Sequence, residues 1–577
     1  AAFEAQLKST FYGHIATKRF SAIELRNQKD LADLRYPLEW YPATRELQRK
    51  IHLHVGPTNS GKTYHALKAL EKAATGVYAG PLRLLAHEVY TRMNAKGKNC
   101  MLVTGEERRI PDYGDKPNLI SCTVEMMDCS NRMDVAVVDE IQMIGDNDRG
   151  WAWTQALLGV RAKEVHLCGE ERAVPLIKEL VALMGDSLEI HRYERLTPLE
   201  TDPRHLGGRL HKLRKGDCIV SFSILGIHAL RKQIEQTTGK NVAIVYGSLP
   251  PETRAQQARL FNDPDNNYDF LVASDAIGMG LNLSIKRIIF ESSQKNDGSA
   301  MKTLTVSQIK QIAGRAGRYR TSLQDNKEAA SNLDATPPEV EPKTEIIEPP
   351  ADNPSTSLRS SDRSTTGLVT TLYAFDYPVI TDRLKMEAEP ITSAGLFPPS
   401  SVVERFSSYF PPGTPFSYIL LRLHEISRTS SRFHLCGLRD AILVADLIQK
   451  VEGLSTTDRI IFCAAPVSKD PGELLVSLAR CVADQKGGSL LDLPPEQLQL
   501  ELLEQPADGE RSSLRRLERL HKDIILYLWL SYRFSGIFST RQLALYVKGL
   551  VEKKIEETIA KMSFNERSRH RMRVQRE

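Results

Sequence analysis

The sequence lacks the paired cysteines, long apolar runs and strong charge excess that mark several protein classes. Its eight cysteines are scattered from Cys100 to Cys481, with no C-x-x-C pair and no histidine cluster at zinc-binding spacing. We therefore expect reduced, structural thiols, as in an intracellular protein. No run of 18 apolar residues occurs, so no membrane span is expected. The net charge of +5 is small for 577 residues, so any nucleic-acid contact must come from local patches.

Length and composition indicate a globular protein of several domains. With 41% apolar and 26% charged residues the composition is ordinary, and 577 residues are too many for one core. Length alone predicts three or four domains. The chain begins at Ala1-Ala2 without a methionine, so we expect any targeting peptide to lie outside it.

A phosphate-binding loop is the strongest local signal. The stretch between a short apolar run, Ile51–Val55, and a helical segment, Tyr64–Ala74, fits G-x-x-x-x-G-K-[ST] at every fixed position. Backbone N–H groups of such a loop surround phosphates, and the following helix adds its positive dipole end. The alternative is a glycine-rich turn that matches by chance. The predicted nucleotide-binding residues are Gly56, Pro57, Thr58, Asn59, Ser60, Gly61, Lys62 and Thr63, with Lys62 on the β/γ-phosphates and Thr63 on Mg²⁺.

A pair of acids after an apolar run is the second signal. Met133–Val138 reads as a buried strand, and it ends in Asp139 and Glu140. Such a strand end supplies what a Walker B site needs: Asp139 for the Mg²⁺ shell opposite Thr63, and Glu140 to orient and deprotonate the attacking water. The alternative is a solvated turn.

Alternating strand-like and helical runs predict the fold. From residue 47 to 196 the alternation predicts a parallel sheet with helices on both faces, and a second such unit spans 197–381. The second unit has no phosphate loop. It does contain Arg315 and Arg318, which we place on one helix face as donors to the transferring phosphoryl group. A glycine-rich segment after a buried strand, with Asp275 and Gly280, is expected to approach the nucleotide.

Three further regions complete the predicted organisation. Residues 1–46 read as a small helical segment whose Trp40 or Tyr41 either meets the nucleotide base or packs under the first domain. Residues 321–366 are rich in proline and polar residues and predict a flexible insertion. Residues 382–577 predict an all-helical domain, in which Tyr527, Trp529, Tyr532 and Phe534 offer either base stacking or core packing.

These motifs, in this order, resemble DExH-type superfamily-two helicases. Asp139-Glu140-Ile141-Gln142 departs from both Asp-Glu-Ala-Asp and Asp-Glu-Ala-His. Together with Leu167-Cys168-Gly169-Glu170 and Tyr246–Arg254, it resembles the ATP-dependent RNA helicase of the mitochondrial degradosome, the "suppressor of Var" family. Phe462–Val467 and Leu526–Phe534 extend the resemblance into the C-terminal region. The fold it implies is two tandem RecA-like α/β domains flanked by helical segments.

The resemblance also implies roles for individual residues. Lys62, Asp139 and Glu140 take the catalytic roles argued above, Arg315 and Arg318 are arginine fingers, and Gln311 is a γ-phosphate sensor. The cofactors are ATP and Mg²⁺. The implied RNA-backbone contacts, for which helix caps and strand ends are the alternative, are Pro81, Arg83, Thr104, Thr123, Ser223 and Ser274.

The activity expected from the resemblance is ATP-driven 3′ to 5′ translocation along RNA in the mitochondrial matrix. The partners expected are single-stranded or partly duplex RNA and a 3′-exoribonuclease, either RNase II-like or a polynucleotide phosphorylase. Two alternatives remain from the residues alone. One is a DNA-directed repair helicase with the same motor, and the other is a non-motor RNA-binding scaffold of a ribonuclease complex.

Overall fold

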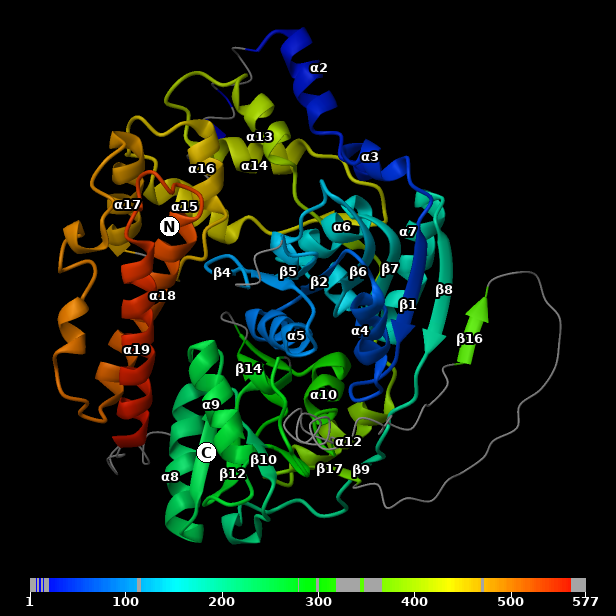
Figure 1. The fold of residues 1–577 in the computed structure, drawn as a ribbon, viewed down its shortest axis with the longest axis vertical. Coiled ribbons are helices and arrows are strands. Elements are labelled where there is room, and N and C mark those ends of the chain that lie inside the picture. The colour runs from blue at the N-terminus through cyan, green and yellow to red at the C-terminus, as the bar shows by residue number, and fades with distance from the viewer. Residues whose placement is uncertain are drawn as a thin grey trace.

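The computed structural model describes residues 20–111, 116–278, 280–296, 300–317, 366–468 and 472–561, with residues 7, 10, 11 and 14 and the backbone of 343–346. Two parallel sheets lie one above the other, and helices of the C-terminal half stand beside both (Figure 1). We call the sheet units lobe 1 and lobe 2. The prediction of two RecA-like sheets with a helical C-terminal region is confirmed.

Lobe 1 is built on a nine-stranded sheet. Its strands run parallel except at the two edges, where β16 and β4 pair antiparallel with their neighbours. In spatial order the strands are β16 (Lys343–Ile346), β8 (Ser187–Arg192), β1 (Lys50–Val55), β7 (Arg161–Gly169), β6 (Arg132–Val138), β2 (Gly76–Gly80), β5 (Leu119–Thr123), β3 (Cys100–Val103) and β4 (Arg108–Arg109). The helices of the lobe are α4 (Lys62–Lys72), α5 (Arg83–Ala95), α6 (Gly150–Gly159) and α7 (Val174–Met184), with 3-10 turns η2 (Val124–Met126), η3 (Ile141–Gly145) and η4 (Glu171–Ala173).

Lobe 2 repeats the plan with six parallel strands. Their order is β11 (Asn241–Val245), β12 (Tyr268–Ala273), β10 (Asp217–Val220), β13 (Arg287–Phe290), β17 (Gly367–Thr371) and β9 (Leu199–Thr201). A small hairpin, β14 (Gln294–Asn296) and β15 (Met301–Thr303), follows β13. The helices are α8 (Ile224–Thr238), α9 (Pro251–Asn262), α10 (Val306–Ala313) and α12 (Tyr377–Lys385), with η5 (Leu210–Lys212) and η6 (Asp275–Gly278).

The remaining elements are almost all helical. At the N-terminal end are α2 (Ala22–Leu31), η1 (Pro37–Trp40) and α3 (Pro42–Arg45). The C-terminal half holds α13 (Ser400–Ser407), α14 (Phe416–Ile426), α15 (Arg439–Leu447), α16 (Thr456–Cys463), α17 (Gly472–Asp484), η7 (Leu490–Asp492), η8 (Leu500–Leu503), α18 (Arg511–Ser531) and α19 (Arg541–Lys561). A short parallel pair, β18 (Ala394–Leu396) and β19 (Phe433–Leu435), was not predicted from the sequence. No helix among the described residues has the length and apolar character needed to cross a membrane.

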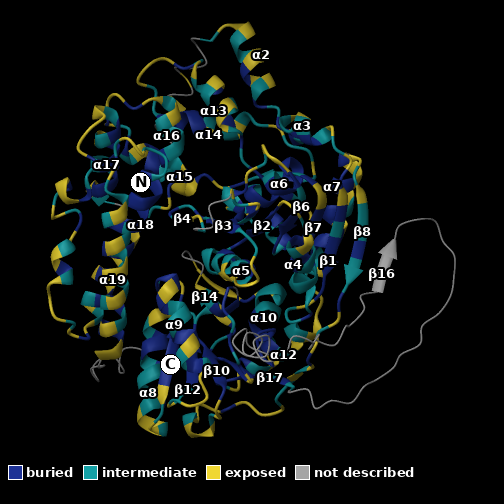
Figure 2. Ribbon diagram, in the orientation of Figure 1, coloured by how far each residue is buried: buried dark blue, intermediate teal, exposed yellow. Residues whose placement is uncertain are grey.

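The two lobes differ in what covers them. In lobe 2, residues of the sheet such as Ile219 and Ile244 belong to the same buried cluster as residues of α15 to α19, such as Leu528 and Val551. Lobe 1 has its own clusters, which take in from the described C-terminal half only Ile391 and residues of β18 and β19. Figure 2 shows the buried strands inside each lobe and the buried inner faces of the C-terminal helices. Helices α15 to α19 are therefore part of the hydrophobic core of lobe 2, whereas α13 and α14 belong to a separate buried cluster.

Three details differ from the sequence-based expectations. Helix α10 ends at Ala313, so Arg315 lies in the turn after the helix and not on its face; Gly314 and the glycine at 317 favour ending the helix there. The predicted insertion 321–366 includes a backbone strand, β16, which pairs antiparallel with β8; the rest of it lies outside the described residues. Helix α12 runs past the predicted domain boundary at 382 and contacts α10 and β17.

Candidate nucleotide-binding site

The predicted phosphate loop lies at the carboxyl end of β1, directly before α4. Gly61 has a φ of +81° and Asn59 a φ of +65°, so the loop uses left-handed backbone where glycine and asparagine are favoured. A Cβ on Gly56 would lie 2.6 Å from the carbonyl oxygen of Tyr193, so only glycine fits there. The Lys62 ammonium donates to the Pro57 carbonyl at 3.2 Å and so folds back over the loop.

Asp139 ends β6 and faces the start of α4. Its Oδ1 accepts from the Thr63 hydroxyl at 3.2 Å, and its Oδ2 accepts from the Tyr78 hydroxyl at 3.0 Å. Burial, reinforced by the charge of Glu140, raises the pKa of Asp139 to about 6, while Lys62 opposes the shift. A hydroxyl and a carboxylate this close are oxygen ligands of the kind that Mg²⁺ prefers, so the donor set fits the ion.

Glu140 is held in an unusual backbone conformation beside Asp139. Its φ of +52° is rare for a residue other than glycine, and strain of this kind concentrates at functional sites. The Trp153 indole donates to the Asp139 carbonyl at 2.9 Å, and the Gln142 amide donates to the Glu140 carboxylate. The tetrad residue Gln142 thus orients the carboxylate that was predicted to activate water.

Arg195 joins the phosphate loop to lobe 2, and sequence reasoning missed it. Its guanidinium donates to the Thr58 carbonyl at 2.9 Å, to the Gly314 carbonyl at 2.9 Å and to the Ala316 carbonyl. A Cβ on Gly314 would lie 2.8 Å from the Thr58 Cβ, so the two backbones meet closely. Arg195 lies outside every motif, in the segment that links the lobes, and only its neighbourhood in space reveals it.

A second contact closes the same seam. Asn59 donates to the Thr197 hydroxyl at 3.0 Å, and that hydroxyl donates to the Gly317 carbonyl at 2.5 Å. The phosphate loop therefore touches the 314–317 segment through both Arg195 and Thr197. Arg318, a predicted finger, lies outside the described residues.

The predicted lobe 2 residues lie near this seam with varied partners. Arg315 is buried and donates to the Gly278 carbonyl within its own lobe. Gln311 packs beside Gly278. Asp275 pairs with Lys295 at 2.5 Å. Gly280, with a φ of +75°, meets Leu82 of lobe 1: its added Cβ would lie 2.9 Å from the Leu82 Cδ1.

The predicted RNA contacts have structural partners. Ser223 caps α8 by accepting from Gly226 N at 3.3 Å, and Ser274 accepts from Ala276 N at 3.0 Å. Thr104 is buried, with its hydroxyl 3.3 Å from the Glu107 carbonyl, and Thr123 is buried at the end of β5. Arg83 pairs with Glu106, and the Pro81 carbonyl accepts from Arg149 at 2.9 Å.

For the two groups of aromatic residues the alternatives were contact with a base or packing in a core, and the structure favours packing for most of them. Trp40 and Tyr41 pack against the core of lobe 1, and a Cβ on Gly159 would lie 2.7 Å from the Tyr41 ring. Tyr527 and Trp529 are 1% and 7% exposed, as core packing requires. Tyr532 differs, because it lines a cavity of about 440 Å³ together with Arg108, Ser535, Arg541, Gln542 and Leu545.

The C-terminal helices also contact lobe 1 at β4. Tyr532 accepts from Arg108 N at 3.2 Å, and the Arg108 guanidinium lies 5.3 Å from the centre of its ring. Arg533 lies 3.4 Å above the Trp529 ring and donates to the Gly105 carbonyl at 3.3 Å. A Cβ on Gly105 would come within 2.9 Å of Trp529, so the loop before β4 fits directly against α18.

Models of known families match four parts of the chain. The DEXQ-box helicase domain of Suv3 matches residues 37–193, and the helicase conserved C-terminal domain matches 205–320. The Suv3 C-terminal domain 1 matches residues 444–483, and the ATP-dependent RNA helicase SUV3 C-terminal domain matches 514–561. The matches thus cover both lobes and the C-terminal helices.

Curated relatives agree over most of the chain. "ATP-dependent RNA helicase SUPV3L1, mitochondrial" of Danio rerio is 40% identical over 516 residues, covering 88% of this chain and 62% of that protein. "ATP-dependent RNA helicase SUV3, mitochondrial" of Saccharomyces cerevisiae is 39% identical over 540 residues, covering 92% and 68%. "DExH-box ATP-dependent RNA helicase DExH16, mitochondrial" of Arabidopsis thaliana is 38% identical over 538 residues, covering 93% and 86%. The chain spans 62% of the length of the first of these relatives and 68% of the second.

Proposed function

Because the chain belongs to the Suv3 family of ATP-dependent RNA helicases, we propose that it hydrolyses ATP between its lobes to move along RNA and unwind it. The observation that carries the proposal is the joint cluster of Thr63, Asp139 and Glu140 beside a seam that ties the phosphate loop to lobe 2. A nucleotide bound between the lobes would therefore contact residues of both.

The proposed division of labour follows from the contacts. The loop amides and Lys62 bind the phosphates, with Lys62 leaving the Pro57 carbonyl to do so. Mg²⁺, when bound, neutralises phosphate charge, and Thr63 and Asp139 are the residues that would hold it. Glu140, oriented by Gln142, takes the proton of the attacking water. Arg315, Arg318 and Gln311 are proposed to act from lobe 2 on the γ-phosphate, and Asp275 and Gly280 to support the nucleotide.

RNA is proposed to lie across both lobes, with Pro81, Arg83, Thr104, Thr123, Ser223 and Ser274 near its backbone. The cavity lined by Arg108, Arg541 and Tyr532 adds two cations and an aromatic ring, which suit phosphate and base. Movement 3′ to 5′, delivery of RNA to a 3′-exoribonuclease and a place in the mitochondrial matrix follow from the family and remain parts of the proposal. Its relatives are named mitochondrial RNA helicases.

The test compares ATP hydrolysis with and without single-stranded RNA in the full chain and in Lys62→Ala. We expect RNA to stimulate the native chain and Lys62→Ala to be inactive with RNA affinity retained. A duplex with a 3′ overhang should then be unwound in preference to one with a 5′ overhang. Stimulation by single-stranded DNA alone would transfer the assignment to a DNA helicase, and hydrolysis indifferent to both polymers would refute the motor.

A further inference from the structure

Four histidines gather on one face of three neighbouring strands in lobe 1. His52 and His54 lie two residues apart on β1 and therefore face the same side of the sheet. His166 lies on β7, and His191 lies on β8. In the parallel register His52 is level with His166 and with Glu189, and His54 is level with His191. We call these four residues the histidine cluster. Their spacing along the sequence gives no hint of it, because the strands come from distant segments.

The imidazoles form two edge-to-edge pairs that stack on one another. His52 Nδ1 is 3.1 Å from His191 Nε2, and His54 Nε2 is 2.9 Å from His166 Nδ1. The His52 ring stacks on His166 with centroids 4.7 Å apart, and the His54 ring stacks on His191 at 4.8 Å. His54 also reaches the Tyr193 hydroxyl at 2.8 Å, which leaves both of its nitrogens engaged.

One corner of the cluster has the dimensions of a metal site. His52 Nδ1 and His191 Nε2 lie 3.1 Å apart, and the Glu189 carboxylate lies 3.5 Å from His52 Nδ1 and 3.7 Å from His191 Nε2. Two ligands on a tetrahedral Zn²⁺, each bonded at about 2.1 Å, are separated by about 3.4 Å. All three side chains are largely buried, at 12%, 12% and 19% exposure for His52, His191 and Glu189.

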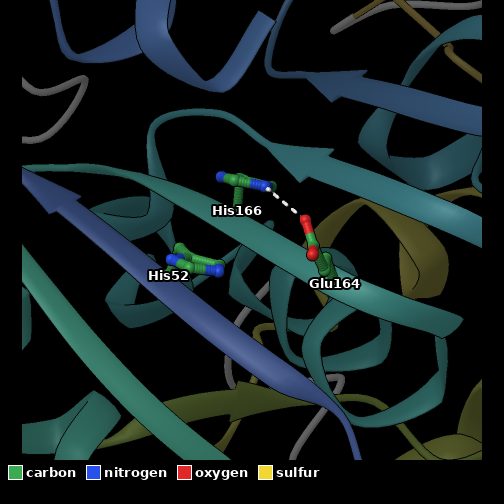
Figure 3. Close-up of side chains that lie close together, drawn as sticks. All are labelled: His52, Glu164 and His166. Atoms are coloured by element: carbon green, nitrogen blue, oxygen red, sulfur yellow. Dashed lines mark ion pairs between the residues drawn. The ribbon is translucent and has the colours of Figure 1, made fainter. Parts of the chain in front are cut away.

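A second corner is less suited. Figure 3 shows His52 and His166 one above the other, with Glu164 reaching His166 Nε2 at 3.6 Å. The two rings are nearly parallel, at 9°, so their in-plane lone pairs run side by side and do not converge on one point. Glu164 is also half exposed. Ring rotation would be needed before His52 and His166 could bind the same ion.

The hydrogen bond at this corner has to rearrange when an ion binds. His52 Nδ1 and His191 Nε2 lie 3.1 Å apart, so one of them carries the proton of their hydrogen bond. An ion binds both nitrogens only once that proton has moved to the outer nitrogen of its ring.

Among the residues that the structure describes, the cation paired with Glu189 at this corner is exposed. Lys50 pairs with Glu189 at 3.1 Å but is 52% exposed, so it can swing into solvent. The contrast is a third group of similar composition, Glu252, His521 and Glu552, which encloses the Lys548 ammonium at 2.8 Å from both carboxylates. That group already holds its cation, whereas the corner at His52 is held by a displaceable one.

The geometry points to a binding site for one Zn²⁺-class transition-metal ion, with His52 Nδ1, His191 Nε2 and Glu189 as ligands and solvent in the fourth position. Two imidazoles and one carboxylate match the ligands that zinc accepts. The ion would tie β8 to β1 close to the phosphate loop, because His52 lies four residues before Gly56 and Tyr193 abuts Gly56. This site is separate from the proposed Mg²⁺ ligands Thr63 and Asp139.

The test titrates the metal-stripped full chain with Zn²⁺ against a chromophoric chelator, in excess Mg²⁺, and repeats the titration with Co²⁺ to record its tetrahedral absorption. We expect one ion per chain and a raised unfolding temperature. His52→Gln, His191→Gln and Glu189→Gln should each weaken binding at least about tenfold and remove the Co²⁺ absorption. His87→Gln, on α5, is the matched control and should bind as the native chain does.

Two outcomes would overturn the assignment. One is the absence of saturable binding to the native chain at micromolar Zn²⁺. The other is full binding by His191→Gln together with loss in His166→Gln and Glu164→Gln, which would place the ion at the other corner. Circular dichroism and ATP binding identify any variant that fails to fold, and a milder His191→Asn then replaces it. Because metal binding is read directly, failure here leaves the motor proposal untouched.

Discussion

At the amino ends of their strands the two lobes are stabilised in the same way, whereas at the carboxyl ends they differ. At the amino ends of the strands each lobe buries an arginine against aspartate. Arg49, before β1, pairs with Asp186 at 2.6 Å, and Arg287, which begins β13, pairs with Asp217 at 2.6 Å and Asp202 at 2.9 Å.

The carboxyl ends differ. In lobe 1 they present Thr63, Asp139 and Glu140, with a strained backbone and a raised pKa. In lobe 2 the side chains that follow the carboxyl ends of strands, Ser223 and Ser274, accept hydrogen bonds from nearby backbone N–H groups. The two lobes thus share a buried arginine at the amino ends of their strands, while at the carboxyl ends lobe 1 brings together a hydroxyl and two carboxylates. Strand carboxyl ends are where ligands bind in open parallel sheets.

The largest expected effect tests the carboxyl ends of the lobe 1 strands, where Glu140 lies. Glu140→Gln keeps the size and the contact with Gln142 but removes the base, so we expect kcat for ATP hydrolysis to fall about 10²- to 10⁴-fold. Fluorescent-nucleotide affinity should change little. Glu171→Gln, an exposed position in the same lobe, is the control and should remain active. Normal turnover by Glu140→Gln would remove the assumed difference between the lobes.

The next largest effect tests the buried arginines at the amino ends of the strands. Arg49→Met and Arg287→Met each remove the nearest cationic partner of a buried aspartate and should cost about 3–5 kcal/mol in the affected lobe. Hydrogen exchange read lobe by lobe is the measurement, since the domains need not unfold together. We expect Arg287→Met to weaken protection in α18 and α19 as well, because they share the core of lobe 2. Equal loss in both lobes from either variant would contradict separate cores.

A smaller effect concerns the seam between the lobes. Arg195→Ala removes four hydrogen bonds from a charged donor, to the Thr58, Thr197, Gly314 and Ala316 carbonyls. Bonds of this kind contribute about 1.5–3 kcal/mol, so we expect about tenfold or greater loss of RNA-stimulated hydrolysis, with basal hydrolysis reduced less. Arg192→Ala, which pairs with the exposed Glu171 at 3.1 Å, is the matched control. Equal loss of basal and stimulated rates would show that Arg195 supports only the loop.

The smallest effect is a shift in pH dependence. Burial raises the pKa of Asp139 to about 6, so below that pH the protonated side chain cannot ligate Mg²⁺, and Mg²⁺·ATP affinity should fall as pH drops through about 6. The charge of Glu140 contributes to the raised pKa, so the midpoint should move to lower pH in Glu140→Gln. Binding measured between pH 5 and pH 8, with the exposed Glu171→Gln as control, checks this. An unchanged pH midpoint in Glu140→Gln would show that the charge of Glu140 does not raise the pKa of Asp139.

The sequence predicted what is encoded locally and missed what depends on distant neighbours. The phosphate loop, the buried strand before Asp139 and the presence of two parallel sheets follow from spacing and periodicity. The order of the strands within each sheet was not predicted. Arg49, Arg195 and Arg287 carry no local signal, because each acts through partners far along the chain. The contact of Gly280 with Leu82 had no local signal either, while its approach to the nucleotide stays a prediction. Arg315 was expected on a helix that ends two residues earlier.

The histidine cluster shows the same limit. The sequence has no histidine cluster at zinc-binding spacing, and that observation is correct. Three parallel strands from residues 50–55, 161–169 and 187–192 nevertheless bring four imidazoles together. Parallel register, not spacing, decides which side chains meet, and register follows from a topology that only the whole fold fixes.

The C-terminal helices hold the two lobes by interactions of different kinds. Their polar contacts with lobe 2 include the Lys548 pair with Glu252, whereas on lobe 1 the rings of Trp529 and Tyr532 lie against Gly105 and Arg108. Added salt screens a partly exposed ion pair more than it disturbs packed rings. Ionic strength therefore acts as a selective solvent variable: it loosens this polar contact with lobe 2 first and leaves the packing of Trp529 against Gly105 in place.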